Sequence, residues 1–139
     1  MKGYTKTLFP GQYLQGAGVI SRLPSLINKR GQLALAIISP PVYDKVTPLI
    51  QGSAECVFST DRCTLAEIER LKSLATDVGA TVIVGCGGGN TIDLSKAIAD
   101  ELKLANIVCP TTAASDAPCS SVSMVNDEMC IRDRLYAAP

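Results

Sequence analysis

Short apolar runs alternate along this chain with stretches of helical period. Residues Leu33–Ile38 and Thr81–Val84 are continuous apolar runs that end at a breaker, which is typical of strands buried on both faces. Residues Ala54–Phe58 and Ala105–Cys109 are weaker strand candidates. Because helical patterns separate these strands, the sequence predicts βαβ units, and hence a parallel sheet with helices on both faces and right-handed crossovers.

A helix is predicted from Thr64 to Val78. It opens with the capping-box sequence Thr64-Leu65-Ala66-Glu67, and Gly79 stands where a left-handed C-terminal residue belongs. Its apolar positions share one face: Leu65, Ile68, Leu71 and Ala75. A second helix is predicted through Lys103, capped by Asn90 or Thr91 and with Asp93 in its positive first turn.

Two further helices are expected, each of which contains proline. One extends from near Ser21 to Lys29, where Pro24 is tolerated if it lies in the first turn, since its missing N–H costs nothing there. The other extends from about Val42 to Gln51 and is weakened by Pro48.

Composition narrows the range of functions. The chain has 139 residues, enough for one domain, with 13 basic and 13 acidic side chains and no histidine. The zero formal charge gives no electrostatic footprint for nucleic acid, and the longest apolar run is far short of the ~20 residues of a membrane helix, so we expect neither partner. The N-terminus lacks the apolar stretch of a secretory signal, which favours a cytoplasmic location.

The absence of histidine and the spacing of the cysteines exclude several chemistries. Without histidine the chain cannot form a Ser-His-Asp or Cys-His catalytic group, and any zinc site would depend on cysteine and carboxylate alone. The six cysteines include no Cys-x-x-Cys pair or zinc-knuckle spacing, so we interpret them as small buried hydrophobic residues.

A glycine-rich segment stands between a predicted strand and a predicted helix, with the sequence Gly85-Cys86-Gly87-Gly88-Gly89-Asn90-Thr91. Glycines let the backbone approach a ligand closely and adopt positive φ, and the start of a helix offers N–H groups to an anion. The spacing is neither Gly-x-Gly-x-x-Gly nor a Walker A sequence. We interpret the segment as a diphosphate-binding turn, with a purely structural βα turn as the alternative.

A second candidate segment, residues Pro110–Ser121, immediately follows the strand candidate Ala105–Cys109. It carries several hydroxyl groups and a single carboxylate, that of Asp116. Ligands of open α/β sheets bind beyond the carboxyl ends of the strands, so we expect this segment and the glycine-rich segment to line one crevice. Asp116 then faces a ligand, with an Asx turn or local cap as the alternative interpretation.

Three segments together resemble a known family: Phe9–Ala17, Gly87–Ala97 and Pro110–Ser123. They resemble glycerol dehydrogenases, a group within the metal-dependent (iron-containing) alcohol dehydrogenase family, and the likeness covers roughly residues 8–128. The triple glycine is shared with relatives such as dehydroquinate synthase, whereas Pro-Thr-x-Ala-x-x-Asp-Ala-Pro is most specific to glycerol dehydrogenases.

The resemblance implies an NAD-dependent oxidoreductase that converts glycerol to dihydroxyacetone, with a divalent metal, zinc or iron, as Lewis acid. It also implies two domains. Residues 1–128 would form a Rossmann-like dinucleotide-binding domain of the dehydroquinate synthase-like fold, and a C-terminal helical domain is missing. The family's metal ligands, one aspartate and two histidines, belong to that missing domain, so we expect no catalytic or metal-binding residue here and no turnover by this chain alone.

By motif position, the resemblance assigns one substrate contact and a set of cofactor contacts. Asp116 would bond the hydroxyls of a small polyol. The cofactor contacts would be Gly88, Gly89, Asn90, Thr91, Ile92, Asp93, Thr111, Ser120 and Val122. Asn90 replaces a family lysine, and Ser39 stands where an aspartate would chelate the ribose hydroxyls and repel a 2′-phosphate, so NADP is not excluded.

Other interpretations stay open. The chain could belong to a lyase of the dehydroquinate synthase type, which uses NAD without net redox change, although Asp116-Ala117-Pro118 speaks against it, or it could be a non-catalytic nucleotide-binding module. Family members often form homo-oligomers, which we expect at full length. From about Met129 the likeness stops, and the sequence Met-Cys-Ile-Arg-Asp-Arg looks like translated sequencing adaptor, so residues 129–139 are predicted to be a non-native or disordered tail.

Overall fold

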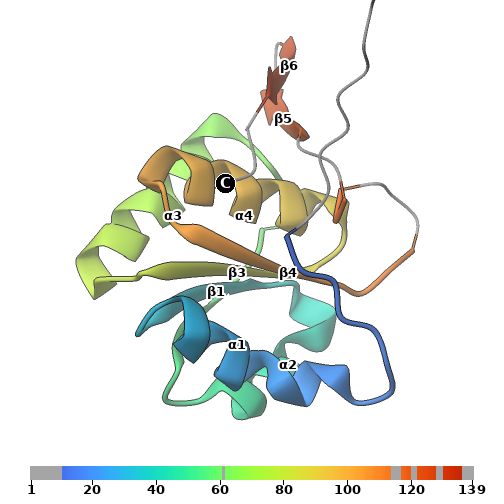
Figure 1. Cartoon of the computed structure of the whole chain (residues 1–139). Helices are drawn as coiled ribbons and strands as arrows, with labels where there is room; N and C mark the ends of the chain where they lie inside the picture. The colour runs from blue at the N-terminus through green and yellow to red at the C-terminus, as the bar shows by residue number, and fades with distance from the viewer. Residues whose placement is uncertain (1–10, 61, 114–116, 120–121, 128–129, 136–139) are drawn as a thin grey trace, which may run out of the picture.

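A computed structural model describes the chain except for residues 1–10, 61, 114–116, 120–121, 128–129 and 136–139. Its centre is a parallel four-stranded sheet in the order β2-β1-β3-β4. The strands are β1 (Ala34–Ile38), β2 (Ala54–Phe58), β3 (Val82–Gly87) and β4 (Ala105–Pro110). Figure 1 shows α1 (Leu23–Arg30) and α2 (Pro40–Ile50) on one face, and α3 (Leu65–Val78) and α4 (Gly89–Leu102) on the other. The predicted α/β fold, Rossmann-like with a parallel sheet and helices on both faces, is confirmed.

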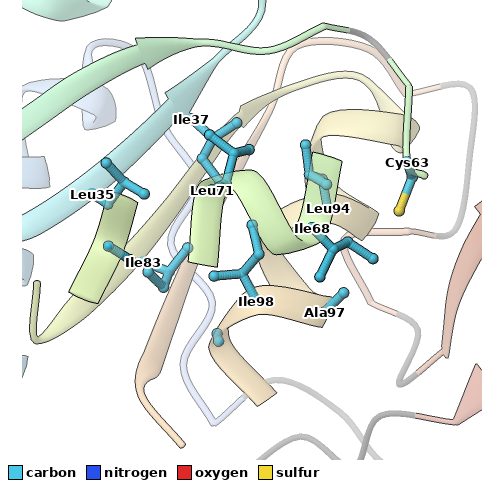
Figure 2. Packing of buried hydrophobic residues seen from close by; sticks show 11 residues of the cluster. Leu35, Ile37, Cys63, Ile68, Leu71, Ile83, Leu94, Ala97 and Ile98 are labelled. Carbon is cyan, nitrogen blue, oxygen red and sulfur yellow. The ribbon is translucent and has the colours of Figure 1, made fainter. Parts of the chain in front are cut away.

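The two central strands are apolar on both sides because each side faces a helix layer. Leu35, Ile37 and Ile83 point toward α3 and α4, where they pack with Ile68, Leu71, Leu94 and Ile98 (Figure 2). The alternate positions of β1 and β3 pack with α1 and α2 through Leu23, Ile27, Val46 and Ile50. Every residue of β1 is fully buried, as expected for a central parallel strand.

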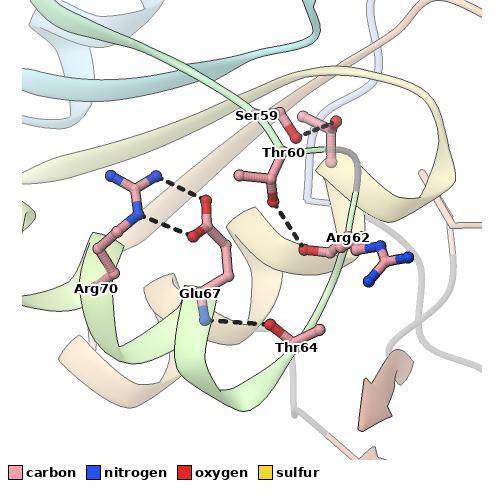
Figure 3. A network of polar contacts seen from close by, with 7 residues as sticks. Ser59, Thr60, Arg62, Thr64, Glu67 and Arg70 are labelled. Carbon is pink, nitrogen blue, oxygen red and sulfur yellow. Dashed lines mark hydrogen bonds and ion pairs between the residues drawn. The ribbon is translucent and has the colours of Figure 1, made fainter. Parts of the chain in front are cut away.

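Helix α3 has the ends that the sequence predicts. The Thr64 Oγ1 accepts a hydrogen bond from the Glu67 N–H at 3.2 Å, and Gly79 closes the helix in the left-handed conformation with φ of 72°. The Glu67 carboxylate also accepts two hydrogen bonds from the Arg70 guanidinium, at 2.7 and 2.8 Å (Figure 3). The predicted Thr64 cap and the Gly79 end are therefore confirmed, whereas the Glu67 side chain pairs with Arg70 rather than with the Thr64 N–H of a full capping box.

Helix α4 begins earlier than predicted. Gly88 is its N-cap and Gly89 its first residue, so the predicted caps, Asn90 or Thr91, are wrong. The physical reason is that β3 does not end at Val84: its ladder with β4 continues to Gly87, which leaves a single residue between strand and helix. Asp93 consequently lies beyond the first turn of the helix.

The proline-containing helices form as predicted with shifted boundaries. Pro24 lies in the first turn of α1, which follows a short 3₁₀ helix, η1 (Val19–Arg22). Helix α2 begins at Pro40, two residues before the predicted start, because prolines lack only N–H groups that the first turn does not use. It continues past Pro48 to Ile50.

Beyond the main sheet, β5 (Val122–Asp127) and β6 (Cys130–Leu135) form an antiparallel pair on the side of α4 (Figure 1). Residues 130–135 of the predicted tail are thus in a strand, while their non-native origin stays a prediction. Among the described residues, no helix has the length and apolar character needed to cross a membrane.

Candidate functional site

The segments that follow the four parallel strands meet at the end of the sheet where all four strands have their carboxyl ends. Ser39, after β1, donates its N–H to the Cys86 carbonyl of β3 at 2.9 Å, and Ser59, after β2, donates its N–H to the Ile38 carbonyl at 2.8 Å. Thr111, after β4, donates its N–H to the Gly87 carbonyl at 3.0 Å. The glycine-rich turn and the start of the 110–121 segment are therefore side by side, as the sequence predicts.

Two of the glycines are required by packing. A Cβ on Gly85 would lie 2.6 Å from the Ser95 Cβ, and one on Gly87 would lie 2.9 Å from the Ser39 Cβ and 3.0 Å from the Thr91 Cβ. Helix α4 and the segment after β1 therefore approach β3 as closely as they do only because these side chains are absent. The expectation that the glycines of this segment adopt positive φ is wrong, since the strand continues through Gly87 in extended conformation.

Gly88 differs from these glycines. Its φ of −81° and ψ of −173° are open to any residue, and among the described residues a Cβ built on it would meet no atom within 4 Å. Neither backbone conformation nor internal packing thus requires glycine here. The first turn of α4, with its N–H groups and the positive end of the helix dipole, is directed to the Gly88 side.

A buried chain of hydroxyl groups holds the first turn of α4 in place. The Thr91 Oγ1 lies 2.8 Å from the Ser39 Oγ and donates to the Ser59 Oγ at 2.9 Å; Figure 3 shows the Ser59 end of this chain. All three residues are buried. The sequence analysis did not predict that Ser39 and Ser59 each pair with Thr91, although the position of each serine directly after a predicted strand was a usable signal.

A nearly buried ion pair links α4 to the segment after β4. The Lys96 Nζ lies 3.1 Å from the Asp93 carboxylate and donates a hydrogen bond of 2.8 Å to the Ala117 carbonyl. The side chains of Asp93 and Lys96 are only 10% and 13% exposed. Burial raises the pKa of the neighbouring Cys63 thiol to about 12, and the Asp93 charge adds to the rise, so this cysteine stays protonated as a buried apolar residue.

The predicted cofactor contacts differ in exposure, and some of them lie outside the described residues. Asn90 and Thr111 are exposed, whereas the side chains of Thr91 and Ile92 are buried. A ligand contact from Thr91 would come from its main chain, but the Ile92 N–H already donates to the Gly88 carbonyl at 3.1 Å. Val122 is the first residue of β5. Asp116 and Ser120 lie outside the described residues. The described part of the chain holds no group of three or more histidine, cysteine, aspartate or glutamate side chains suited to a metal ion.

The parallel sheet with a glycine turn between its third strand and the following helix defines an α/β protein of the Rossmann-like class. The family model described as iron-containing alcohol dehydrogenase matches residues 10–135. The chain belongs to the iron-containing alcohol dehydrogenase family.

Glycerol dehydrogenases are among its relatives. The chain is 38% identical to the enzyme of Thermotoga maritima over 133 residues, covering 87% of this chain and 35% of the relative, and 34% identical to that of Pseudomonas putida, covering 94% and 38%. The crystal structure of a probable glycerol dehydrogenase from Sinorhizobium meliloti superposes with a TM-score of 0.84 at 30% identity, covering 90% of this chain and 35% of that one. The chain thus spans little more than a third of these proteins.

Alanine substitutions distinguish Gly87, where neighbouring atoms exclude a side chain, from Gly88, where they do not. We expect Gly87→Ala to lower the free energy of unfolding by about 1–3 kcal/mol, because the new methyl group displaces Ser39 from Thr91. Gly88→Ala is expected to lower it by only about 0.5 kcal/mol, since the methyl group enters open space and only the preference of an N-cap for glycine over alanine is lost. Urea unfolding followed by circular dichroism measures both, and equal destabilisation would contradict this account of the turn.

Proposed function

We propose that this chain is the dinucleotide-binding portion of a longer polyol dehydrogenase that transfers hydride from glycerol to NAD or NADP. Its membership of the iron-containing alcohol dehydrogenase family and its glycerol dehydrogenase relatives support this assignment. Residues 1–128 form the dinucleotide-binding domain in this proposal, and the rest of the enzyme lies outside the 139 residues.

The unexplained glycine at position 88 carries the proposal. Gly85 and Gly87 have neighbours that exclude a side chain, whereas Gly88 has an ordinary φ and no atom of the described residues within 4 Å of a Cβ at its position. A residue without a side chain is then accounted for by an external group that approaches the main chain. The adjacent start of α4 attracts negative charge, so a diphosphate fits the position.

Different residues around this turn would hold different parts of the dinucleotide. The main-chain N–H groups at Gly88, Gly89 and Asn90 would hold the diphosphate, and Thr111, tied to Gly87, would border the nucleotide on the β4 side. We propose further contacts from positions 91–93, Ser120 and Val122, and a role for Asp116 in bonding the polyol hydroxyls.

When bound, the nicotinamide ring supplies the hydride acceptor. The chain's own residues bind and orient that cofactor. The two layers of helices and the ties among the strand ends keep the turn in one geometry. The described residues hold no group of three or more side chains suited to a divalent metal, and in this proposal the zinc or iron of the complete enzyme is held by residues outside the described part of the chain.

Binding measurements on the 139-residue chain test the role of Gly88. Gly88→Ala is expected to weaken the binding of NAD and NADP at least ~10-fold, because a methyl group occupies the place of the phosphate oxygens. Gly11→Ala is the matched control, since Gly11 also has open space around it and no positive φ. Calorimetric titration with each dinucleotide measures the effect, and unchanged affinity in Gly88→Ala would remove the central support of the proposal.

The chain alone is expected to bind the dinucleotide without catalysing its reduction. Mixed with glycerol, NAD and either zinc or ferrous iron, it should form no NADH above the enzyme-free rate, because no metal-binding group stands in its described part. NADH absorbance measures this, and dinucleotide titration under the same conditions confirms that the site is filled. Sustained NADH formation would show that the catalytic residues are already present.

The choice between NAD and NADP is testable at Ser39. Its hydroxyl lies at the carboxyl end of β1, where a carboxylate would bond the ribose hydroxyls and repel a 2′-phosphate. We expect Ser39→Asp to shift the ratio of the two affinities toward NAD by about 10-fold.

Ser59→Asp is the matched control for this variant, since Ser59 belongs to the same buried hydroxyl chain but follows β2. Thermal melts of both variants exclude unfolding as the cause. An equal shift in both variants, or a shift toward NADP, would count against this assignment of the ribose position.

A further inference from the structure

Two cysteines lie side by side on neighbouring strands of the central sheet. Cys86 on β3 and Cys109 on β4 are register partners in the parallel ladder, so their side chains leave the sheet on the same face. Both pack against the same apolar cluster under α1 and α2. The two thiols are also hydrogen-bonded to each other.

The hydrogen bond shifts the pKa values of the two thiols in opposite directions. Donation from Cys109 lowers the pKa of Cys86, against the opposing effect of burial. The pKa of Cys109 is raised by the same hydrogen bond and by burial. Cys86 is therefore the thiol that ionises first, and Cys109 keeps its proton. A nucleophilic thiolate beside a protonated thiol is the arrangement of a reactive cysteine with its resolving partner.

Access and spacing both allow a reaction between the two sulfur atoms. Cys86 is 1% exposed, but Cys109 is only half-buried and lies on β4, an edge of the four-stranded sheet. A small solute would therefore have to approach the pair from the Cys109 side. Neighbouring strands are about 4.7–4.9 Å apart, which lies within the range of about 4.4–6.8 Å between the Cα atoms of disulfides.

We propose that Cys86 and Cys109 form a reversible oxidation site, which hydrogen peroxide converts into a disulfide between β3 and β4. The Cys86 thiolate attacks one peroxide oxygen, the O–O bond breaks, and the leaving oxygen takes up a proton as water. The Cys109 thiol then attacks the Cys86 sulfenic acid, the S–O bond breaks, and a second water leaves with the thiol proton. Two thiols are oxidised and one peroxide is reduced to two waters.

The expected disulfide is easily reduced. The strands lie about 4.7–4.9 Å apart, whereas the Cβ atoms of a relaxed disulfide lie about 3.5–4.5 Å apart, so the bond would draw the strand ends together and store strain. Strained disulfides are the ones that cellular thiols reduce readily.

The ends of β3 and β4, which the disulfide would draw together, belong to the candidate site. Gly87 and Pro110, the next register pair, precede the glycine turn and Thr111. Oxidation is therefore expected to weaken dinucleotide binding, an effect that rests on the proposed function, whereas disulfide formation itself does not.

Peptide mapping of the full 139-residue chain tests the pair directly. In a background where the exposed Cys119 and also Cys130 are serine, trypsin places Cys86 alone in the peptide 73–96 and Cys109 alone in the peptide 104–132. After treatment with hydrogen peroxide, mass spectrometry without reductant should find these two peptides joined, and dithiothreitol should separate them. Cys86→Ala should abolish the link and slow the peroxide-dependent loss of the Cys109 thiol at least ~10-fold.

Cys56→Ala is the matched control, because Cys56 is also half-buried on an edge strand but its register partner is Ala36. This variant should form the link at the parental rate. Circular dichroism verifies the fold of each variant, and the background protein alone decides the outcome if a variant does not fold. Sulfinic acid on either cysteine without a link, or no link after complete exposure to peroxide, would overturn the proposal.

Titration of the oxidised and reduced background proteins with NAD and NADP separates the two inferences. A linked protein with at least ~10-fold weaker binding than the reduced form supports both. A linked protein with unchanged binding supports the oxidation site and removes its effect on the cofactor. A reduced protein that binds neither dinucleotide contradicts the proposed function and leaves the peptide map valid.

Discussion

The rest of the site depends on the close approach of helix α4 to strand β3. Side chains are absent at Gly85 and Gly87, and Ser95, Ser39 and Thr91 occupy the space that they would fill. Core packing leaves little room for adjustment, so adding even one methyl group at such a contact forces its neighbours apart. This approach sets the start of α4 directly above the carboxyl edge of the sheet, where the dipole of the helix and its first N–H groups can act on a ligand.

Polar contacts then fix what the close packing brings together. The hydroxyl chain of Ser39, Thr91 and Ser59 ties the ends of β1 and β2 to α4. The Asp93–Lys96 pair ties the same helix to Ala117. A buried polar group is costly unless it has a partner, so each of these contacts favours one arrangement of the edge over alternatives. The result is a preorganised edge in which Gly88 is left with open space around it.

The proposed oxidation site and the proposed dinucleotide site use the same two strands in different ways. Cys86 and Cys109 are one residue before Gly87 and Pro110, so a bond between the sulfur atoms acts on the segments that carry the glycine turn and Thr111. A parallel sheet transmits such a change because its strands are joined along their whole length by hydrogen bonds. The pair needs no cofactor for its own chemistry, which keeps the two proposals independent.

The sequence by itself determined the four strands of the main sheet, the four α-helices of the described residues and their layers. Apolar runs such as Leu33–Ile38 have no polar face, so they require cover on both sides, and the caps of α3 are local interactions between neighbouring residues. The glycine turn and its place after a strand were equally visible. Only the tertiary structure decided that β3 extends to Gly87, that the Thr91 hydroxyl pairs with Ser39 and Ser59, and that Cys86 meets Cys109. These contacts depend on strand register and helix approach, which are set by packing between residues far apart in the chain, so the local sequence does not say which residues meet.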